Sequence, residues 1–308
     1  MKIATVTLNP ALDRSIYFED VLKPGELNRI DRAQISAGGK GINVSRMLKK
    51  LDTGSYVYGF VGGKCGKMLT EMLEDEGIRT DFTITSAETR MNVKITEKSG
   101  RETEINERGG PVKQDELCML TEKVKKSHAE IFVISGSTPC GLDDDTVKRI
   151  AGILKMQGKQ VICDVSGQPL KAAVEIRPYL IKPNRSEFCE LLGYQIDEKD
   201  YANEAVRFYN ESGIEVLLTL GKQGAVYSGR GGNYAIKNPQ IKPKGFSGAG
   251  DTFLAGYIYS LINEQPLIEA LRFAAAASYS KVGLMGTQLP DLSLIESNLN
   301  KISVDMID

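Results

Sequence analysis

The chain has 308 residues, and its 39 Lys and Arg residues nearly balance its 40 Asp and Glu residues, for a formal net charge of −1. The hydrophobic content of 41% and the charged content of 26% are ordinary for a globular protein. This balance gives no reason to expect a nucleic-acid or membrane partner, and no apolar run reaches the ~18 residues needed to cross a bilayer. The length allows one large α/β domain or two domains of ~150 residues each.

The few histidines and the scattered cysteines limit the chemistry further. His128 is the single histidine, which excludes multi-histidine metal sites and makes a Ser-His-Asp triad unexpected. The five cysteines are odd in number and form no CxxC pair, which is typical of a reducing compartment, so we expect a cytoplasmic protein. Any catalysis should therefore depend on carboxylates, amides, Lys, Arg and the backbone.

Short apolar runs alternate with longer helical patterns along the chain. Strands are expected at 3–8, 56–61, 131–134, 161–165, 180–182, 216–220 and 225–227. Helices are expected at 42–51, 67–76, 114–127, 143–157, 185–192, 201–212, 251–263, 267–281 and 293–299. This alternation predicts βαβ units in a mostly parallel sheet with helices on both faces, and ligands beyond the carboxyl ends of the strands. The tail at 304–308 is expected to fray.

Two segments, 15–35 and 89–106, interrupt the alternation with strand-like patterns of their own. The second predicts a hairpin with a turn at 98–100, in which Arg90, Asn92 and Lys94 share one face. A solvated strand face is the simplest explanation of these three residues. Strands inserted between βαβ units predict a small extra sheet, which could serve as a lid or as a dimer contact.

The stretch 245–252 is rich in glycine and opens a predicted helix. The free N–H groups and the dipole at such a helix start form an anion site made of backbone alone, and Gly248 and Gly250 let the main chain come close to the anion. Asp251 would then lie where a carboxylate can take the proton from a hydroxyl that attacks phosphorus. Considered alone, the stretch is better explained as a loop with an Asp helix cap.

Polar residues near the first strand suggest a second ligand site. Gly38 and Gly39 permit close approach at another helix start, Lys40 supplies a positive charge that suits a phosphate, and Asn43 can hydrogen-bond sugar hydroxyls. A tight turn with a solvated Lys is the alternative. Asp13 follows the first strand and could bind two sugar hydroxyls, although an Asx-turn around the neighbouring proline is about equally plausible.

Residues after two later strands are suited to a nucleotide. Asn184 and Glu187 are three apart, so on a helix they share a face and could hold the water shell of Mg²⁺; a helix capping box is the compatible alternative. The two glycines of 218–225 could border a nucleotide, or form a hairpin turn. The stretch 62–67 lacks the glycine spacing and the hydroxyl residue of a Walker A loop, so any phosphate cradle must be the turn 248–250.

Taken together, these residues resemble the ribokinase-like (PfkB) carbohydrate kinases, in particular the branch that acts on phosphorylated sugars. The segments 38–43 and 248–252 are similar to the two signatures of that branch, and 5–13, 89–92, 135–137, 164–167, 182–187 and 220–224 fit the pattern in the same order. The resemblance covers nearly the whole chain. It implies an α/β fold with a three-layer α/β/α core and a mostly parallel sheet, in a single domain 1–308 with strands of a β-sheet lid inserted at about 13–36 and 89–107.

The resemblance also implies roles for individual residues. Asp251 would be the catalytic base, and Gly248, Ala249 and Gly250 would form the anion hole. ATP would lie near Asp164, Lys182, Asn184, Thr219, Gly221 and Gly224, with Mg²⁺ held through water by Asn184 and Glu187. The sugar would lie near Asp13, Gly38, Gly39, Asn43, Asn92, Asn106 and Ser137, with its phosphate held by Lys40, Arg90 and Arg29. A homodimer through the lid is also implied, with no nucleic-acid or membrane partner.

The lid sequence suggests which phosphosugar is the substrate. Segments 89–94 and 103–106 resemble the members that phosphorylate the 6-hydroxyl of fructose 1-phosphate with ATP. A tagatose 6-phosphate or fructose 6-phosphate kinase is the alternative, and a non-catalytic sugar-phosphate sensor is a remote one. The chain departs from the family at Phe246-Ser247, where Thr-Val or Ser-Val is usual, and we expect the backbone cradle to survive this change.

Overall fold

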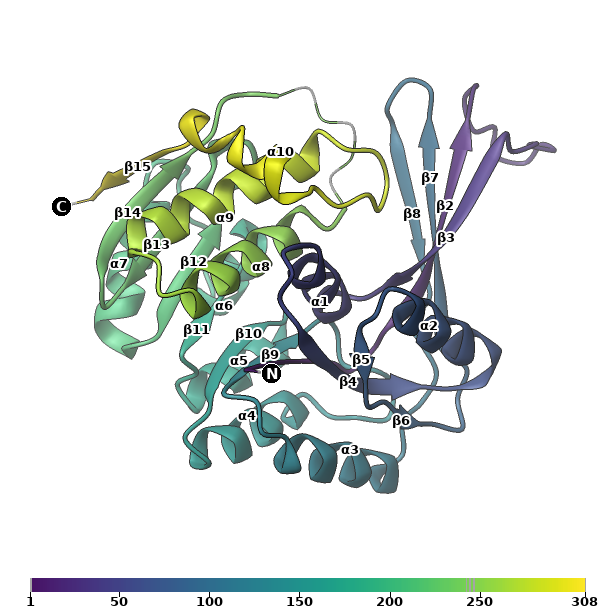
Figure 1. The fold of residues 1–308 in the computed structure, drawn as a ribbon, viewed down its shortest axis with the longest axis horizontal. Coiled ribbons are helices and arrows are strands. Elements are labelled where there is room, and N and C mark those ends of the chain that lie inside the picture. The colour runs from purple at the N-terminus through teal and green to yellow at the C-terminus, as the bar shows by residue number, and fades with distance from the viewer. Residues whose placement is uncertain (1, 242, 244, 246, 308) are drawn as a thin grey trace.

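The computed structural model describes residues 2–241, 243, 245 and 247–307, and its centre is one large, mostly parallel sheet (Figure 1). The strand order is β15-β14-β13-β12-β11-β10-β9-β1-β4-β5, with β6 also paired to β4. Pairs from β12 to β5 are parallel, whereas β12 to β15 pair antiparallel. The strands are β1 (Ile3–Thr7), β4 (Ser55–Val61), β5 (Arg79–Thr80), β6 (Thr83–Ile84), β9 (Ile131–Ser135), β10 (Gln160–Asp164), β11 (Leu180–Ile181), β12 (Glu215–Thr219), β13 (Ala225–Gly229), β14 (Gly232–Lys237) and β15 (Ser303–Met306).

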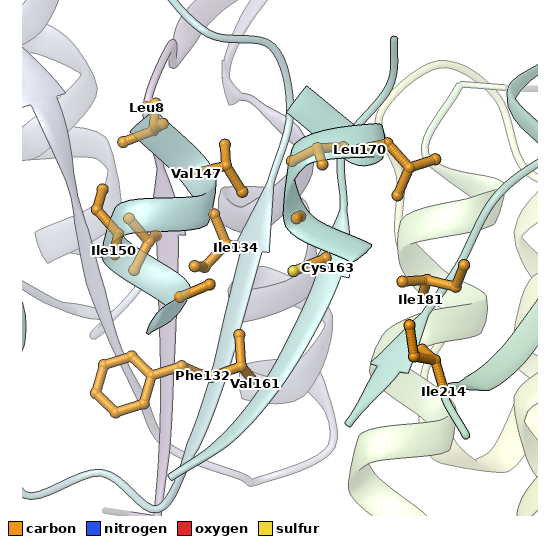
Figure 2. Close-up of a cluster of buried hydrophobic side chains, with 14 of the residues drawn as sticks. Leu8, Phe132, Ile134, Val147, Ile150, Val161, Cys163, Leu170, Ile181 and Ile214 are labelled. Atoms are coloured by element: carbon orange, nitrogen blue, oxygen red, sulfur yellow. The ribbon is translucent and has the colours of Figure 1, made fainter. Parts of the chain in front are cut away.

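Helices cover both faces of this sheet, because its central strands are apolar on both sides. In β9, Phe132 and Ile134 pack into one core cluster, while Ile131 and Val133 pack into the other. The first cluster, part of which is drawn in Figure 2, is closed by α3 (Gln114–Lys126), α4 (Thr146–Met156), α5 (Gln168–Glu175), α6 (Arg185–Leu192) and α7 (Tyr201–Ser212). The second is closed by α1 (Lys40–Lys50), α8 (Ala249–Ile262), α9 (Leu267–Val282) and α10 (Leu292–Glu296). The predicted three-layer α/β/α core is confirmed.

A separate sheet of four strands projects from the edge of the core (Figure 1). Its order is β3-β2-β7-β8, made from β2 (Ala11–Phe18), β3 (Arg32–Gly38), β7 (Arg90–Glu97) and β8 (Glu102–Asn106). Parallel pairing of β2 with β7 sets Asp13 opposite Asn92. This four-stranded sheet is called the lid below. The same register gives it a polar face with Asp13, Asn92 and Lys94, and an apolar face with Val93 and Ile105. A third apolar cluster packs α2 (Gly63–Asp75) against the end of the lid that joins the core.

Five helices and strands of the described residues were not expected from the sequence, and two of them, β5 and β6, are only two residues long. Helix α5 follows Gly167 and has a proline in its first turn, a combination that also marks a loop. Strand β14 begins at a glycine and buries two large side chains, Tyr234 and Ile236, and the C-terminal strand β15 is four residues long. The expectation that 304–308 frays was wrong for Val304–Met306, which pair with β14, and Asp308 lies outside the described residues. None of the helices within the described ranges is long and apolar enough to cross a membrane.

Candidate active site

The first turn of α8 presents unused backbone donors. The helix starts at Ala249 behind Gly248, whose φ of 78° favours glycine. The N–H and the hydroxyl of Thr252 both donate to the carbonyl oxygen of Gly248, at 2.9 and 2.8 Å. No side chain in the described part of the chain caps this helix start. The amides of Ala249, Gly250 and Asp251 therefore have no partner within the helix and, with the helix dipole, form a candidate anion site.

Asp251 is a buried carboxylate at that helix start, with 7% of its surface exposed. The side-chain amide of Asn43 on α1 donates to its Oδ2 at 2.8 Å. Burial, and then the negative charge of Asp164, raise the pKa of Asp251 to about 6, against the opposing effect of Asn43, Lys182 and Lys40. The carboxylate is therefore ionised at neutral pH and is a stronger base than an ordinary Asp, as a general base requires.

Asp164, at the carboxyl end of β10, pairs with two ammonium groups, those of Lys40 and Lys182. Its Oδ1 lies 3.1 Å from Nζ of Lys40 and 3.2 Å from Nζ of Lys182. Complete burial opposes the ionised form of Asp164, but the ammonium groups of Lys182 and Lys40 hold its pKa below the usual value. Lys40 also lies 3.5 Å from Oε1 of Glu187, and although burial opposes its charge, these carboxylates raise its pKa. Lys40 therefore carries its positive charge at neutral pH, beside the ionised carboxylate of Asp164.

The start of α6 fits the helix-cap interpretation of Asn184 and Glu187. The Asn184 N–H donates to Oε2 of Glu187, and the Glu187 N–H donates to Oδ1 of Asn184, both at 2.9 Å. In the described ranges, no group of three or more His, Cys, Asp or Glu side chains could enclose a metal ion. Oδ2 of Asp164 has no hydrogen-bond partner among the described residues. A few carboxylate oxygens without a full cage are the donor set that Mg²⁺ takes when water and phosphates complete its shell.

A cavity of about 920 Å³ opens along the sheet edge beside α8. Asn184, Thr219, Gly221 and Gly224 line it, and Ala249 and Gly250 of the anion site form part of its wall. Its size suits a nucleotide. Gly224 has a φ of 92°, and a Cβ atom there would lie 2.0 Å from the carbonyl oxygen of Ile236, so the β12–β13 turn needs glycine. The structure thus brings these four predicted residues together at one cavity.

A second polar cluster lies on the polar face of the lid. Asp13, 3% exposed, accepts hydrogen bonds from Nδ2 of Asn92 at 2.9 Å and from Nζ of Lys94 at 2.8 Å. A Cβ atom at Gly38 would lie 2.6 Å from Cγ of Asp13, so the glycine makes room for the carboxylate. Gly39, with a φ of 117°, makes the turn into α1. Asp13, Asn92, Lys94, Gly38 and Gly39 therefore form one cluster, called the Asp13 cluster below.

The other residues that were predicted to bind the sugar and its phosphate are not part of the Asp13 cluster. Arg90 donates to the carbonyl oxygens of Asn9, at 3.0 and 3.2 Å, and Glu107, at 2.9 Å. Ser137, after β9, accepts from Nδ2 of Asn9 at 3.1 Å. Asn106 is exposed and donates to Glu104, and Arg29 is exposed in the loop between β2 and β3. The structure thus leaves Arg29 and Asn106 on the surface of the lid.

Sequence reasoning missed two residues that connect these parts. Lys94 was treated as part of a solvated strand face, yet its Nζ donates to Oγ of Ser247 at 2.6 Å as well as to Asp13. Lys94 therefore links the lid to the turn before α8. Ser247 belongs to the departure from the family at Phe246-Ser247, of which Phe246 lies outside the described residues. Asn9 connects Arg90 with Ser137. Lys94 is two residues after Asn92, so strand alternation could have placed it on the same face as that predicted residue. Asn9 could have been found from its place at the end of the first strand.

Comparison with known proteins identifies the class to which this site belongs. Residues 6–293 match the model of the pfkB family carbohydrate kinases. The chain belongs to this family of carbohydrate kinases, and the enzyme transfers a phosphoryl group to an alcohol group of a sugar.

Particular relatives cover nearly the whole chain. It is 36% identical to the 1-phosphofructokinase of Bacillus subtilis, over 89% of this chain and 90% of the relative. A Thermotoga maritima structure named as a possible 1-phosphofructokinase superposes with a TM-score of 0.92 at 30% identity, covering 99% of each chain. The phosphofructokinase-2 of Escherichia coli in complex with fructose-6-phosphate superposes with a TM-score of 0.89 at 28% identity, over 97% of this chain and 98% of that one.

Proposed function

We propose that the protein transfers the terminal phosphoryl group of ATP to the 6-hydroxyl of fructose 1-phosphate, giving fructose 1,6-bisphosphate. The observation that carries this proposal is the turn before α8, which connects the two sides of the site. Ala249 and Gly250 line the 920 Å³ cavity, and Ser247 contacts Lys94 of the Asp13 cluster. Asp251 follows directly, as a buried base. The 1-phosphofructokinase relatives support this sugar phosphate as the acceptor.

The chain's own groups account for the chemical step. Asp251 takes the proton of the 6-hydroxyl as its oxygen bonds to the terminal phosphorus, and the bond to the ADP oxygen breaks. The amides at Gly248, Ala249 and Gly250 hold the charge on the transferring group. Asp164 pairs with Lys182, whose Nζ would lie 3.4 Å from a Cβ atom at Gly250 in the wall of the cavity. Closure of the lid would exclude water and so limit hydrolysis of ATP.

Two cationic residues are proposed to recognise the phosphate that the sugar already carries. Arg90 and Lys40 would anchor it, so that binding energy from the non-reacting end helps to position the 6-hydroxyl. Lys40 also contacts Asp164 and Glu187, so its ammonium group can serve the transferred phosphoryl group as well. Arg29, exposed at the lid, is proposed as a third contact in the assembled enzyme.

Magnesium fits the oxygen donors near Asn184, which lines the cavity. Glu187 and Asn184 would hold the ion through water, and the unpartnered Oδ2 of Asp164 is a further oxygen for its shell. The ion would neutralise charge on the donor phosphates.

We also propose that two copies associate through their lids. The exposed large hydrophobic residues of the lid include Leu27, Ile30 and Ile105, and such a group favours a protein contact. Ile105→Glu should convert a dimer to a monomer in size-exclusion chromatography with light scattering. Met156→Glu, on α4 outside the lid, is the matched control and should leave the dimer intact. A wild-type protein that is monomeric at micromolar concentrations would contradict this assembly.

Product analysis tests the proposed reaction. Phosphorus NMR of a mixture with MgATP and fructose 1-phosphate should show ADP and fructose 1,6-bisphosphate appearing together in equal amounts. Binding of phosphosugars without any turnover would instead revive the sensor alternative.

A further inference from the structure

Lys281 is a buried lysine close to the anion site at the start of α8, which is also called the cradle below. It is the second-to-last residue of α9, and only 1% of its surface is exposed. Its Nζ donates to the carbonyl oxygen of Gly286, in the loop that follows, at 2.7 Å. Taking an ammonium group out of water is costly, and one carbonyl oxygen offsets only part of that cost. A lysine in this position therefore calls for an explanation beyond packing.

The side chain lies directly against the turn that starts α8. A Cβ atom at Gly248 would have Cε of Lys281 at 3.7 Å as its nearest neighbour, followed by Nδ2 of Asn43 at 4.0 Å. Because Asn43 also holds Asp251, the same turn is supported by the partner of the base and by this lysine. Displacement of Lys281 would therefore change the support of the anion-site amides.

The hydrogen bond to Gly286 extends this support to the lid. A Cβ atom at Gly286 would lie 2.3 Å from the hydroxyl oxygen of Tyr17 on β2, so the loop packs tightly against the lid there. A Cβ atom at Gly245, just before the cradle, would lie 3.3 Å from the carbonyl oxygen of Leu284 and 3.7 Å from Oε1 of Glu102 on β8. One ammonium group thus fixes a loop that lies between the lid strands and the chain entering α8.

The charges around Lys281 come from three elements. Lys94 on β7 and Glu102 on β8 act on it from the lid, and Asp251 acts on it from α8. Burial, and then Lys94, lower the pKa of Lys281 to about 8, while Glu102 and Asp251 oppose this shift. Lys281 is therefore mostly charged at neutral pH and adds positive potential behind the amides that meet the phosphoryl group.

We propose that Lys281 is a positioning residue for phosphoryl transfer, an internal cation that holds the loop 283–288 against the turn 247–250 and so keeps the anion-site amides aligned. This proposal rests on the proposed kinase function. Its effect should be on the chemical step rather than on binding of the sugar, because Lys281 lies behind the cradle and not in the Asp13 cluster.

The first test compares Lys281→Met with Lys155→Met. Lys155 also lies at the end of a helix, α4, and donates to a loop carbonyl, that of Arg177 at 2.9 Å, but it is exposed and not part of the site. We expect Lys281→Met to lower kcat roughly tenfold to hundredfold, the effect of a misaligned reacting group, with KM for the phosphosugar within about threefold of wild type. Lys155→Met should match wild type in both. Unchanged kcat in folded Lys281→Met would overturn the proposal.

Chemical rescue distinguishes charge from packing. Turnover of Lys281→Ala should rise with added ammonium or methylammonium chloride, but not with tetramethylammonium chloride at the same ionic strength. The absence of rescue in a folded variant would overturn the internal-cation role. If Lys281→Met does not fold, Lys281→Gln carries the same expectation, and wild-type kcat in that variant would overturn the proposal. Wild-type turnover reports on the kinase function itself, so the two failures are distinguishable.

Discussion

Asp251 shows how one carboxylate acquires the properties of a base from its surroundings. In water an aspartate is a weak base near neutral pH, because its pKa is about 4. Here burial and the charge of Asp164 move the pKa to about 6, while Asn43 fixes one oxygen at 2.8 Å. The carboxylate is therefore ionised at pH 7, but burial and the neighbouring negative charge raise the free energy of its ionised form. This suits a group that must accept a proton during the reaction.

Asp251→Asn tests this role. We expect turnover to fall by a factor of about 100 or more, the usual contribution of a positioned base. The wild-type rate should also decline as pH drops below about 6, the pKa of Asp251, because the base becomes protonated. Near-normal turnover of the Asn variant would rule out a catalytic-base role.

The same substitution makes a prediction about stability. A raised folded-state pKa means that the ionised carboxylate opposes folding at neutral pH, and that this cost disappears below the unfolded pKa of about 4. The melting temperature of Asp251→Asn should therefore equal or exceed that of wild type at pH 7.5, with the difference shrinking towards pH 4. A variant clearly less stable than wild type at pH 7.5 would contradict the sign of this effect.

At the scale of elements, local signals predicted most helices, and non-local contacts were missed. Helices α6 and α7 were expected with the bounds that the structure gives, and the structure shows that glycines in the left-handed conformation, Gly193 and Gly213, end them. The cradle residues Gly248 and Asp251 were also recognisable from their local pattern. The contact of Lys94 with Ser247 joins positions 153 apart, and no local pattern reveals it. Burial of Lys281 likewise follows from tertiary packing alone.

The fit between β3 and β2 yields a prediction at this scale. Gly38→Ala would place a methyl group within 2.6 Å of the Asp13 carboxylate, so Asp13 must move away from Asn92 and Lys94. We expect KM for the phosphosugar to rise roughly tenfold, the value of one charged hydrogen bond, with KM for ATP little changed. Gly152→Ala is the matched control, since its nearest neighbour would be 3.9 Å away. Equal sugar KM values in both variants would remove Asp13 from the sugar site.

The whole molecule brings distant segments to one edge of the sheet. The carboxyl ends of β10 and β12 supply Asp164 and Thr219, the lid supplies Asp13 and Lys94, and α8 supplies Asp251, the proposed base. Strand alternation predicted this edge as the ligand site, and the two strand-like segments inserted in that alternation predicted the small extra sheet beside it. How the lid lies relative to the cradle could not be predicted from the sequence, because it depends on the parallel register of β2 with β7.

The comparison of acceptors tests the central claim most directly. Initial rates with MgATP would be measured by coupled ADP release against fructose 1-phosphate, fructose 6-phosphate, tagatose 6-phosphate and free fructose. The account predicts the highest kcat/KM for fructose 1-phosphate and almost none for free fructose, which lacks the anion that Lys40 and Arg90 are proposed to bind. A higher kcat/KM for either 6-phosphate would contradict the assigned substrate while retaining the base and the cradle.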